Sequence, residues 1–219
     1  MMLIQILAVV GLLVVPSHQQ LVSWQEFSNA VTIHGFPAPQ QIQYTTFLQG
    51  LPLGGITNRQ EAAMALTQFL HESGGLRFRR EIACEHTGCP EHYRTPGCDA
   101  PGQFYFGRGY IQLTWCGYNY LPFSMSRFGD DRLRWNPDLV ASDEQLAWDS
   151  AFWFWRVNVH NAPGVQQGHF GATTRAINGA LECVNPGGHH LARIRFQMYG
   201  RVRSQWGLPG PGIETGCYN

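Results

Sequence analysis

Two glutamates in the segment FLHESGGLRFRREIAC, residues 69–84, have neighbours of opposite character. Glu72 closes an apolar run before a Gly-Gly break, and Glu81 follows a stretch that contains three arginines. Apolar surroundings disfavour the ionised form of a carboxyl group, and nearby positive charges favour it. Two carboxyl groups in opposite protonation states can divide the roles of general acid and general base. The spacing alone also fits a surface residue at a helix end and a glutamate paired with an arginine.

Glu72 is expected in the last turn of a helix. Residues 58–61, NRQE, form a capping-box pattern in which Asn58 accepts from the backbone and Glu61 reaches back. Apolar residues then recur on one face up to Leu70, and the Gly-Gly pair ends the helix. The negative end of the helix dipole and the apolar neighbours both disfavour an ionised Glu72, which suits a general acid.

Glu81 is expected to be ionised. Arg77, Arg79 and Arg80 precede it, and in an extended segment the first two would share its side. Their charges favour the carboxylate that a general base needs. Glycoside hydrolysis is the reaction class that depends most on such a divided pair. The nine-residue interval allows a short or a long carboxyl separation, so it leaves retention and inversion of the anomer open.

Neutral hydrogen-bonding side chains are concentrated in FYFGRGYIQLTWCGYNY, residues 104–120. Gln112, Thr114, Tyr118 and Asn119 are interleaved there with apolar residues, a composition that suits an uncharged ligand rich in hydroxyl groups. The paired glycines around the arginine of this segment predict a tight turn. A nucleotide site is rejected because the sequence has no phosphate-loop motif.

The elements that must position these residues are mainly helical. Further helices are predicted over residues 23–30, 142–158, 173–178 and 190–205. Aromatic residues three to four apart in the second of these predict a buried face, with an exposed sugar-stacking stripe as the alternative; they are Trp148, Phe152 and Trp155. Strand signals are confined to residues 76–80 and 103–106, which predict a small β-hairpin. The expected architecture is bilobal and mainly α, with a small β element.

Composition and the N-terminal segment narrow the function classes. The 219 residues include 15 basic and 15 acidic side chains, so neither nucleic acid nor an anionic membrane surface is the expected partner. The apolar block that ends at Ser17 predicts a secretory signal over residues 1–17, with a buried N-terminal strand or helix as the alternative. Residues 18–219 show no repeat or long linker and are expected to form a single catalytic domain, most simply a monomer.

Six cysteines, all outside the predicted signal, indicate an exported protein with three disulfides. They are Cys84, Cys89, Cys98, Cys116, Cys183 and Cys217. Counting alone leaves their pairing open. The stretch CEHTGCPEH, residues 84–92, brings possible metal ligands together, but its spacing differs from the paired cysteines of zinc sites. No metal or cofactor is therefore expected.

These segments together resemble the family 19 glycoside hydrolases, a family of chitinases. The resemblance rests on HESGG at residues 71–75, the second glutamate at position 81, and FGRGYIQLTW with YNY in residues 106–120. It continues in the same order and approximate spacing through NPDLVAS, INGALEC and ARIRFQMY, residues 136–142, 177–183 and 192–199. The resemblance implies an α+β, lysozyme-like fold with a central cleft, and hydrolysis of β-1,4-linked N-acetylglucosamine polymers without a cofactor.

The resemblance also implies roles for individual residues. Glu72 matches the general acid and Glu81 the general base of an inverting mechanism, and Thr114 matches a residue that helps to hold the attacking water. Positions that contact sugar in the family correspond to Gln112, Tyr118, Asn119 and Asn178. Positions of a charged network behind the site correspond to Glu182 and Arg193. The family's cysteine order suggests Cys89–Cys98 and Cys183–Cys217, which leaves Cys84–Cys116.

The sequence departs from the family pattern at several points. Tyr110 stands where the family usually has proline, and Leu76 where many plant members have tryptophan, so an aromatic platform is missing there. The short interval between the glutamates resembles the loop-poor members and implies a short cleft. No cysteine-rich chitin-binding module precedes the domain in this sequence, which predicts weaker binding to crystalline chitin.

The leading interpretation is a secreted, extracellular endochitinase that acts on chitin or chitooligosaccharides by inversion. A peptidoglycan-cleaving, lysozyme-like hydrolase is an alternative, because the fold and the carboxylate pair would serve it equally. The near-neutral charge weighs against that alternative, since an anionic cell wall attracts basic proteins. A non-catalytic chitin-binding defence protein would keep the cleft, but the presence of both glutamates weighs against it.

Overall fold

The computed structural model describes residues 20–219, so the predicted signal at residues 1–17 lies outside the described residues. The chain is mainly helical, as predicted. The α-helices are α1 Trp24–Thr32, α2 Gln41–Leu53, α3 Arg59–Glu72, α4 Leu121–Phe128, α5 Arg132–Trp135, α6 Leu139–Ser142, α7 Glu144–Phe154, α8 Phe170–Gly179 and α9 His189–Gln205. Short π- or 3₁₀-helical turns are η1 Cys116–Tyr120, η2 Trp155–Val159, η3 Ala180–Val184 and η4 Pro186–Gly188.

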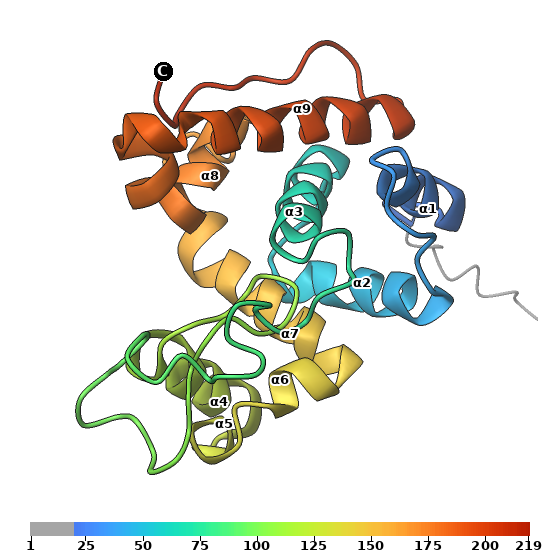
Figure 1. Ribbon diagram of the computed structural model, residues 1–219. Helices are drawn as coiled ribbons and strands as arrows, with labels where there is room; N and C mark the ends of the chain where they lie inside the picture. Colours follow the sequence, from blue (N-terminus) through green and yellow to red (C-terminus); the bar gives the residue numbers. More distant parts are fainter. Residues whose placement is uncertain (1–19) are drawn as a thin grey trace, which may run out of the picture.

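The helices form two groups joined by α7 (Figure 1). One group contains α1, α2, α3, α8 and α9, with α9 lying across the end of α3. The other contains α4–α6 and the long connection from α3 to η1. None of the helices within residues 20–219 is both long and apolar enough to cross a membrane.

An aromatic face that runs from α7 to the first residue of η2 forms the centre of the core. Trp148, Phe152 and Trp155 have no exposed surface, so the prediction that they are buried is confirmed. Phe69 of α3 meets all three edge-on, with ring centroids 5.3–6.0 Å apart. Phe47 of α2 packs against Trp148 and Phe152 on another side. Because aromatic rings bury large apolar areas, this cluster fixes α3, and with it the helix end that carries Glu72.

The N-terminus of α3 uses half of the predicted capping box. The Asn58 side chain accepts from the Glu61 N–H at 2.8 Å, as the sequence predicts. The Glu61 side chain turns into the core instead of reaching back. There one carboxylate oxygen accepts from Trp155 Nε1 at 2.9 Å and lies 2.7 Å from His160 Nδ1. The Glu61 carboxylate is 3% exposed, and a buried carboxylate needs hydrogen-bond partners. Its contacts with Trp155 and His160 therefore replace the predicted hydrogen bond to the Asn58 backbone.

The predicted β-hairpin is reduced to isolated bridges. Residues 20–219 contain no extended strand; Arg108 forms single bridges with Arg80 and with Leu113. Leu76 has a φ of +63°, which breaks the extended run expected at 76–80. Gln112, with a φ of +53°, turns the chain directly after the glycine-flanked turn. Left-handed residues on both sides leave too little extended backbone for a ladder.

The disulfides correct two of the three predicted pairings. The bonds are Cys84–Cys89, Cys98–Cys116 and Cys183–Cys217, so only the last prediction is confirmed. A turn in which the Gly88 N–H donates to the Cys84 carbonyl at 2.7 Å brings the first two Cα atoms within 5.0 Å. The start of η1 brings Cys116 to Cys98, with 5.8 Å between their Cα atoms. Both separations are within disulfide range, and the bonded sulfurs are no longer available to a metal.

Candidate active site

A cleft of about 670 Å³ lies between the two groups of elements and contains both predicted catalytic glutamates. Its lining comes from the end of α3, the long connection, η1, the end of α7, and the α8–η3 junction. The lining residues are Glu72, Glu81, Tyr93, Gly107, Ile111, Gln112, Leu113, Thr114, Trp115, Asn119, Phe154, Ile177, Asn178, Ala180 and Leu181. A hollow of about 420 Å³ continues past the same two glutamates toward His71 and Phe78.

Glu72 lies at the last position of α3 and contacts a buried arginine. Its Oε1 is 2.6 Å from Nη1 of Arg195, whose side chain is 2% exposed. The Glu72 side chain is itself 17% exposed, so it remains open to the cleft. One carboxylate therefore has a fixed positive partner behind it and accessible space in front.

The same arginine binds a second carboxylate more completely. Arg195 Nε and Nη2 donate to the two oxygens of Glu182 at 2.9 and 2.6 Å, and Asn178 Nδ2 donates to Glu182 at 2.8 Å. Burial raises the pKa of Glu182, but the hydrogen bonds and charge of Arg195, with Asn178, outweigh it and lower the pKa overall. Gln68 completes the cluster by accepting from Arg195 Nη1 at 2.8 Å. Arg195 therefore makes two hydrogen bonds to Glu182, while the same guanidinium also faces Glu72 at 2.6 Å.

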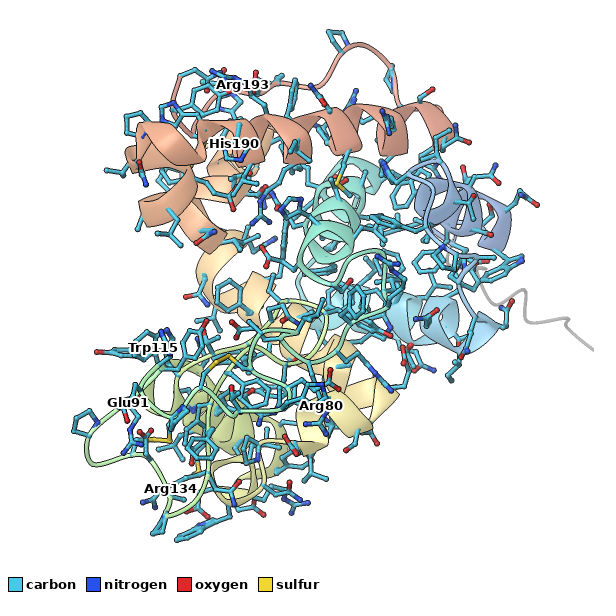
Figure 2. The ribbon with its side chains drawn as sticks, viewed as in Figure 1. Arg80, Glu91, Trp115, Arg134, His190 and Arg193 are labelled. Carbon is cyan, nitrogen blue, oxygen red and sulfur yellow. A yellow bond between two sulfur atoms is a disulfide. The ribbon has the colours of Figure 1, made fainter. Side chains whose placement is uncertain are left out.

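Arg193 was predicted in this network, and that prediction is wrong. Its guanidinium lies over the ring of Tyr218, 5.1 Å from the centroid, and Figure 2 labels it at the edge of α9 away from α3. Two residues along a helix are separated by about 200°, so Arg193 and Arg195 point to opposite faces. The sequence did carry the signal, because Ala192, Arg195 and Tyr199 follow the spacing of a buried helix face.

Glu81 is held by neutral donors. The Tyr93 hydroxyl donates to Oε1 at 3.0 Å, and the Gly107 N–H donates to Oε2 at 3.0 Å. The Glu81 N–H in turn donates to the Gly107 carbonyl at 2.8 Å. Side chain and backbone of Glu81 are therefore both fixed against the first glycine of the tight turn.

The arginines expected to stabilise Glu81 pair with other residues. Arg79 Nη1 lies 3.0 Å from Glu144, and Arg80 Nη1 lies 2.7 Å from Asp138. Arg77 donates to the Gly74 carbonyl at 2.7 Å. Because the segment is not a continuous strand, the arginines do not share a side with Glu81. The predicted pairing of Glu81 with these arginines is wrong, and hydrogen bonds from Tyr93 and Gly107 hold its carboxyl group instead.

Four of the five residues predicted to bind sugar or water line the cleft: Gln112, Thr114, Asn119 and Asn178. Asn119 Nδ2 donates to the Thr114 carbonyl at 2.7 Å, which fixes the two relative to each other. Tyr118 is 73% exposed and is not part of the lining. Trp115, 37% exposed and labelled in Figure 2, lines the cleft, and its ring meets that of Tyr118 with centroids 6.3 Å apart.

Three lining residues adopt a backbone conformation that non-glycine residues rarely take. Tyr93, Gln112 and Trp115 have φ values of +58°, +53° and +68°. Such residues persist only where the surrounding structure determines them, and they concentrate at functional sites. Residue type carries no signal of this kind, so sequence reasoning missed Tyr93 and Trp115.

His71 lies directly before the catalytic candidate Glu72 and remains neutral. Burial lowers its pKa, the charge of Arg195 lowers it further, and Glu182 opposes the shift, giving a pKa of about 4. The imidazole adds no positive charge to the cleft at neutral pH. Arg195 therefore remains the closest cation to Glu72 among the ion pairs of the described residues.

Known proteins with similar sequences are plant chitinases. Endochitinase B of Zea mays is 40% identical over 169 residues, which are 75% of this chain and 57% of that protein. Chitinase 5 of Oryza sativa subsp. japonica is 40% identical over 163 residues, 73% of this chain and 53% of that protein. The chain thus spans about half the length of the curated relatives it matches.

Solved structures extend the similarity to the whole fold. The class IV, family GH19 chitinase of Zea mays aligns with a TM-score of 0.68 at 28% identity, over 90% of this chain and 98% of that chain. Chitinase C of Streptomyces griseus aligns with a TM-score of 0.68 at 26% identity, over 91% and 97%. These alignments confirm the predicted mainly α, lysozyme-like fold class. The glycoside hydrolase family 19 model, described as chitinase class I, matches residues 55–169, and the chain belongs to this family.

Proposed function

We propose that the protein is a secreted endochitinase that hydrolyses β-1,4-linked N-acetylglucosamine polymers with inversion of the anomer. The observation that carries the proposal is that Glu72 and Glu81 line one cleft and are held in different ways. Residues 18–219 would form one catalytic domain acting as a monomer. The three disulfides support an oxidising, extracellular location.

Glu72 is proposed as the general acid. Arg195 carries one positive charge and faces two carboxyl groups, Glu182 through two hydrogen bonds and Glu72 at 2.6 Å. Two ionised carboxylates around one buried arginine would leave a net negative charge in a region of low dielectric, which is costly. A proton on Glu72 removes that excess charge. From the cleft side, Glu72 can then give this proton to the glycosidic oxygen as the bond to the anomeric carbon breaks.

Glu81 is proposed as the general base. Its carboxylate takes a proton from a water molecule, whose oxygen forms the new bond to the anomeric carbon on the face opposite the departing sugar. Thr114, which lines the cleft, would help to hold that water. Inversion requires room for this water between the two carboxyl groups. Glu72 and Glu81 both line the cleft of about 670 Å³ in which the water would stand.

The cleft chemistry supports an uncharged N-acetylated sugar as the substrate. Gln112, Asn119 and Asn178 offer amide groups that both donate and accept, as the hydroxyl and acetamido groups of the sugar require. Trp115 adds an aromatic surface at the same cleft, and the exposed Tyr118 would contact a longer chain beyond it.

The test is to give the purified protein a chitin hexasaccharide and follow the anomer of the new ends by NMR. Fresh α-anomers are expected. Fresh β-anomers would overturn the inverting assignment, and cleavage of peptidoglycan fragments without cleavage of chitin oligosaccharides would overturn the substrate. Glu72→Gln and Glu81→Gln are the matched variants, and each should lose nearly all turnover while still binding oligosaccharide. A catalytically silent wild type that binds chitin would point to a lectin.

A further inference from the structure

Tyr93 makes a contact with Glu81 that the reaction proposed above does not use. Its phenolic hydroxyl donates to Glu81 Oε1 at 3.0 Å, while the Gly107 N–H donates to Oε2 at 3.0 Å. The two donors therefore hold the two carboxylate oxygens separately. Tyr93 also lines the cleft, so the contact lies on the surface that substrate would reach.

We propose that Tyr93 is a positioning residue for the general base: its hydroxyl holds the Glu81 carboxylate in one orientation and stabilises its ionised form. The proposal rests on the proposed function of Glu81. A carboxylate has about four lone-pair sites, so after these two hydrogen bonds it can still accept from a water molecule. Tyr93 thus fixes the rotation of the carboxylate without occupying the position of the nucleophile.

The backbone around Tyr93 is built to present this hydroxyl. Tyr93 has a φ of +58°, uncommon for an aromatic residue, and the preceding residue His92 donates its N–H to the Cys89 carbonyl at 2.9 Å. Cys89 is in turn bonded to Cys84, three residues after Glu81. The ring of Trp115 meets the Tyr93 ring edge-on, with centroids 5.5 Å apart. A disulfide-closed turn and an aromatic neighbour thus hold the strained residue in place.

The hydroxyl remains a donor wherever the enzyme would work. Burial raises the pKa of Tyr93, and its hydrogen bond to Glu81 and the charge of Glu81 raise it further, to about 12. The phenol is therefore protonated throughout the neutral and acidic range. Donation to a carboxylate is charge-assisted and stronger than a neutral hydrogen bond.

The charged side chains near Glu81 are engaged elsewhere. Arg80 and Arg108 both pair with Asp138 at 2.7 Å, and Arg79 pairs with Glu144 at 3.0 Å. Glu72 lines the same cleft with its carboxyl group facing Arg195. Among the described residues, the side-chain hydrogen bond to Glu81 is the one from Tyr93. Removing it should therefore change the orientation of the Glu81 carboxylate directly.

The first test is Tyr93→Phe, which keeps the ring and removes the hydroxyl. On chitin hexasaccharide we expect kcat to fall roughly 10- to 100-fold, the scale of a misplaced catalytic group, with KM changed less than about twofold. The acidic limb of the pH–rate profile should move to higher pH, because a carboxylate that loses a donor is protonated more easily. Tyr218→Phe is the matched control, since it removes a tyrosine–glutamate hydrogen bond between two residues that do not line the cleft, and it should leave both parameters unchanged.

Two kinetic results would overturn the proposal. An unchanged kcat would show that the hydroxyl does not position the base, and a raised KM at unchanged kcat would assign the hydroxyl to substrate binding. Thermal unfolding of Tyr93→Phe checks that a lower kcat does not come from a loosened fold.

The second test does not depend on activity. The carboxyl carbons of the glutamates are labelled with carbon-13, the Glu81 signal is assigned with Glu81→Gln, and its pH titration is compared in wild type and Tyr93→Phe. A midpoint that moves to higher pH in Tyr93→Phe supports the positioning role of Tyr93. If chitin oligosaccharides are nevertheless not cleaved, the proposed function fails and the role of Tyr93 stands. An unmoved midpoint overturns the role of Tyr93 whatever the substrate.

Discussion

The hydroxyl of Tyr110 lies 2.8 Å from Oε1 of Glu144 and links the turn after Arg108 to the first residue of α7. Tyr110 also accepts from Gln43 Nε2 of α2 at 3.0 Å, and its ring packs on Trp148 with centroids 4.4 Å apart. The residue is 1% exposed. Tyr110 thus ties this turn, which is followed by the cleft-lining residues Ile111 and Gln112, to two helices.

Tyr110→Phe should therefore destabilise the fold. The substitution removes a hydrogen bond to a charged group, and such bonds contribute about 1.5–3 kcal/mol. Glu144 keeps its contacts with Arg79 and Trp148 Nε1, so the fold should survive and the melting temperature should fall by several degrees. Differential scanning calorimetry measures the change. The control Tyr118→Phe alters an exposed ring and should have the melting temperature of the wild type. Equal melting temperatures of the two variants would contradict a stabilising role for the hydroxyl of Tyr110.

Arg195→Ala should be far more damaging than Arg193→Ala. The first substitution leaves Glu182, 1% exposed, without its charged partner, and breaking a buried ion pair in this way costs about 3–5 kcal/mol. The second removes a contact with the ring of Tyr218 that is worth about 0.5–1 kcal/mol. Urea unfolding of the two variants, which change neighbouring arginines of one helix, gives the comparison. A larger loss for Arg193→Ala would refute the assignment of the network.

Peptide mapping should recover Cys84–Cys89 and Cys98–Cys116 from the non-reduced protein. Removing the second bond by a Cys98→Ala, Cys116→Ala pair should cost about 3 kcal/mol, because it closes a span of 18 residues. Removing the first bond, which closes a span of five, should cost about 2 kcal/mol. Chemical unfolding of both double variants shows which bond contributes more to the free energy of unfolding. Crossed peptides joining Cys84 to Cys116 would restore the pairing predicted from the sequence.

The free energy of unfolding should decrease as the pH falls from about 6.5 to about 4. Burial and the charge of Arg195 lower the pKa of His71 to about 4, and burial and the charge of Arg201 do the same for His34. An unfolded imidazole takes up its proton near pH 6.5, so in this window the unfolded state binds more protons and is favoured as the pH drops. Glu182, with its lowered pKa, adds a further loss below its unfolded pKa of about 4.3.

Urea titrations at several pH values test this dependence. His71→Gln and His34→Gln should each flatten the curve between pH 6.5 and 4 and leave the more acidic part, due to Glu182, in place. A curve that keeps its full slope in the double variant would exclude the two histidines as its cause.

Local patterns in the sequence predicted the helices that matter most to the site. The cap at Asn58, the Gly-Gly stop and the apolar period located α3 and put Glu72 at its end. The aromatic spacing in α7 predicted its buried face. By contrast, α2 was not predicted, because it contains Gly50 and Pro52, two residue types that disfavour a helix. Its packing against α7 stabilises it nonetheless. A helix can be predicted from the residue pattern within it, but its contacts with other helices cannot.

The electrostatics of the site could be predicted less well. Arginines close to Glu81 in sequence pair with Glu144 and Asp138, because residues 73–77 form a turn and the chain bends at Arg79 instead of extending. The groups that do hold Glu81, a tyrosine hydroxyl and a backbone N–H, come from residues 12 and 26 positions away. Charge can be read from composition, but which donor reaches a carboxylate depends on tertiary geometry.

The two bridges of the long connection follow one another along the chain and do not cross. Cys84–Cys89 closes before Cys98–Cys116 begins, so residues 90–97 form a separate interval between two anchored ends. An interval of this kind can gain or lose residues without disturbing either bond. Because Tyr93 lies within it and lines the cleft, a change in its length would alter the shape of the cleft rim and the hold on Glu81 together. Evolution of substrate selectivity and of turnover would thus be coupled through one eight-residue interval.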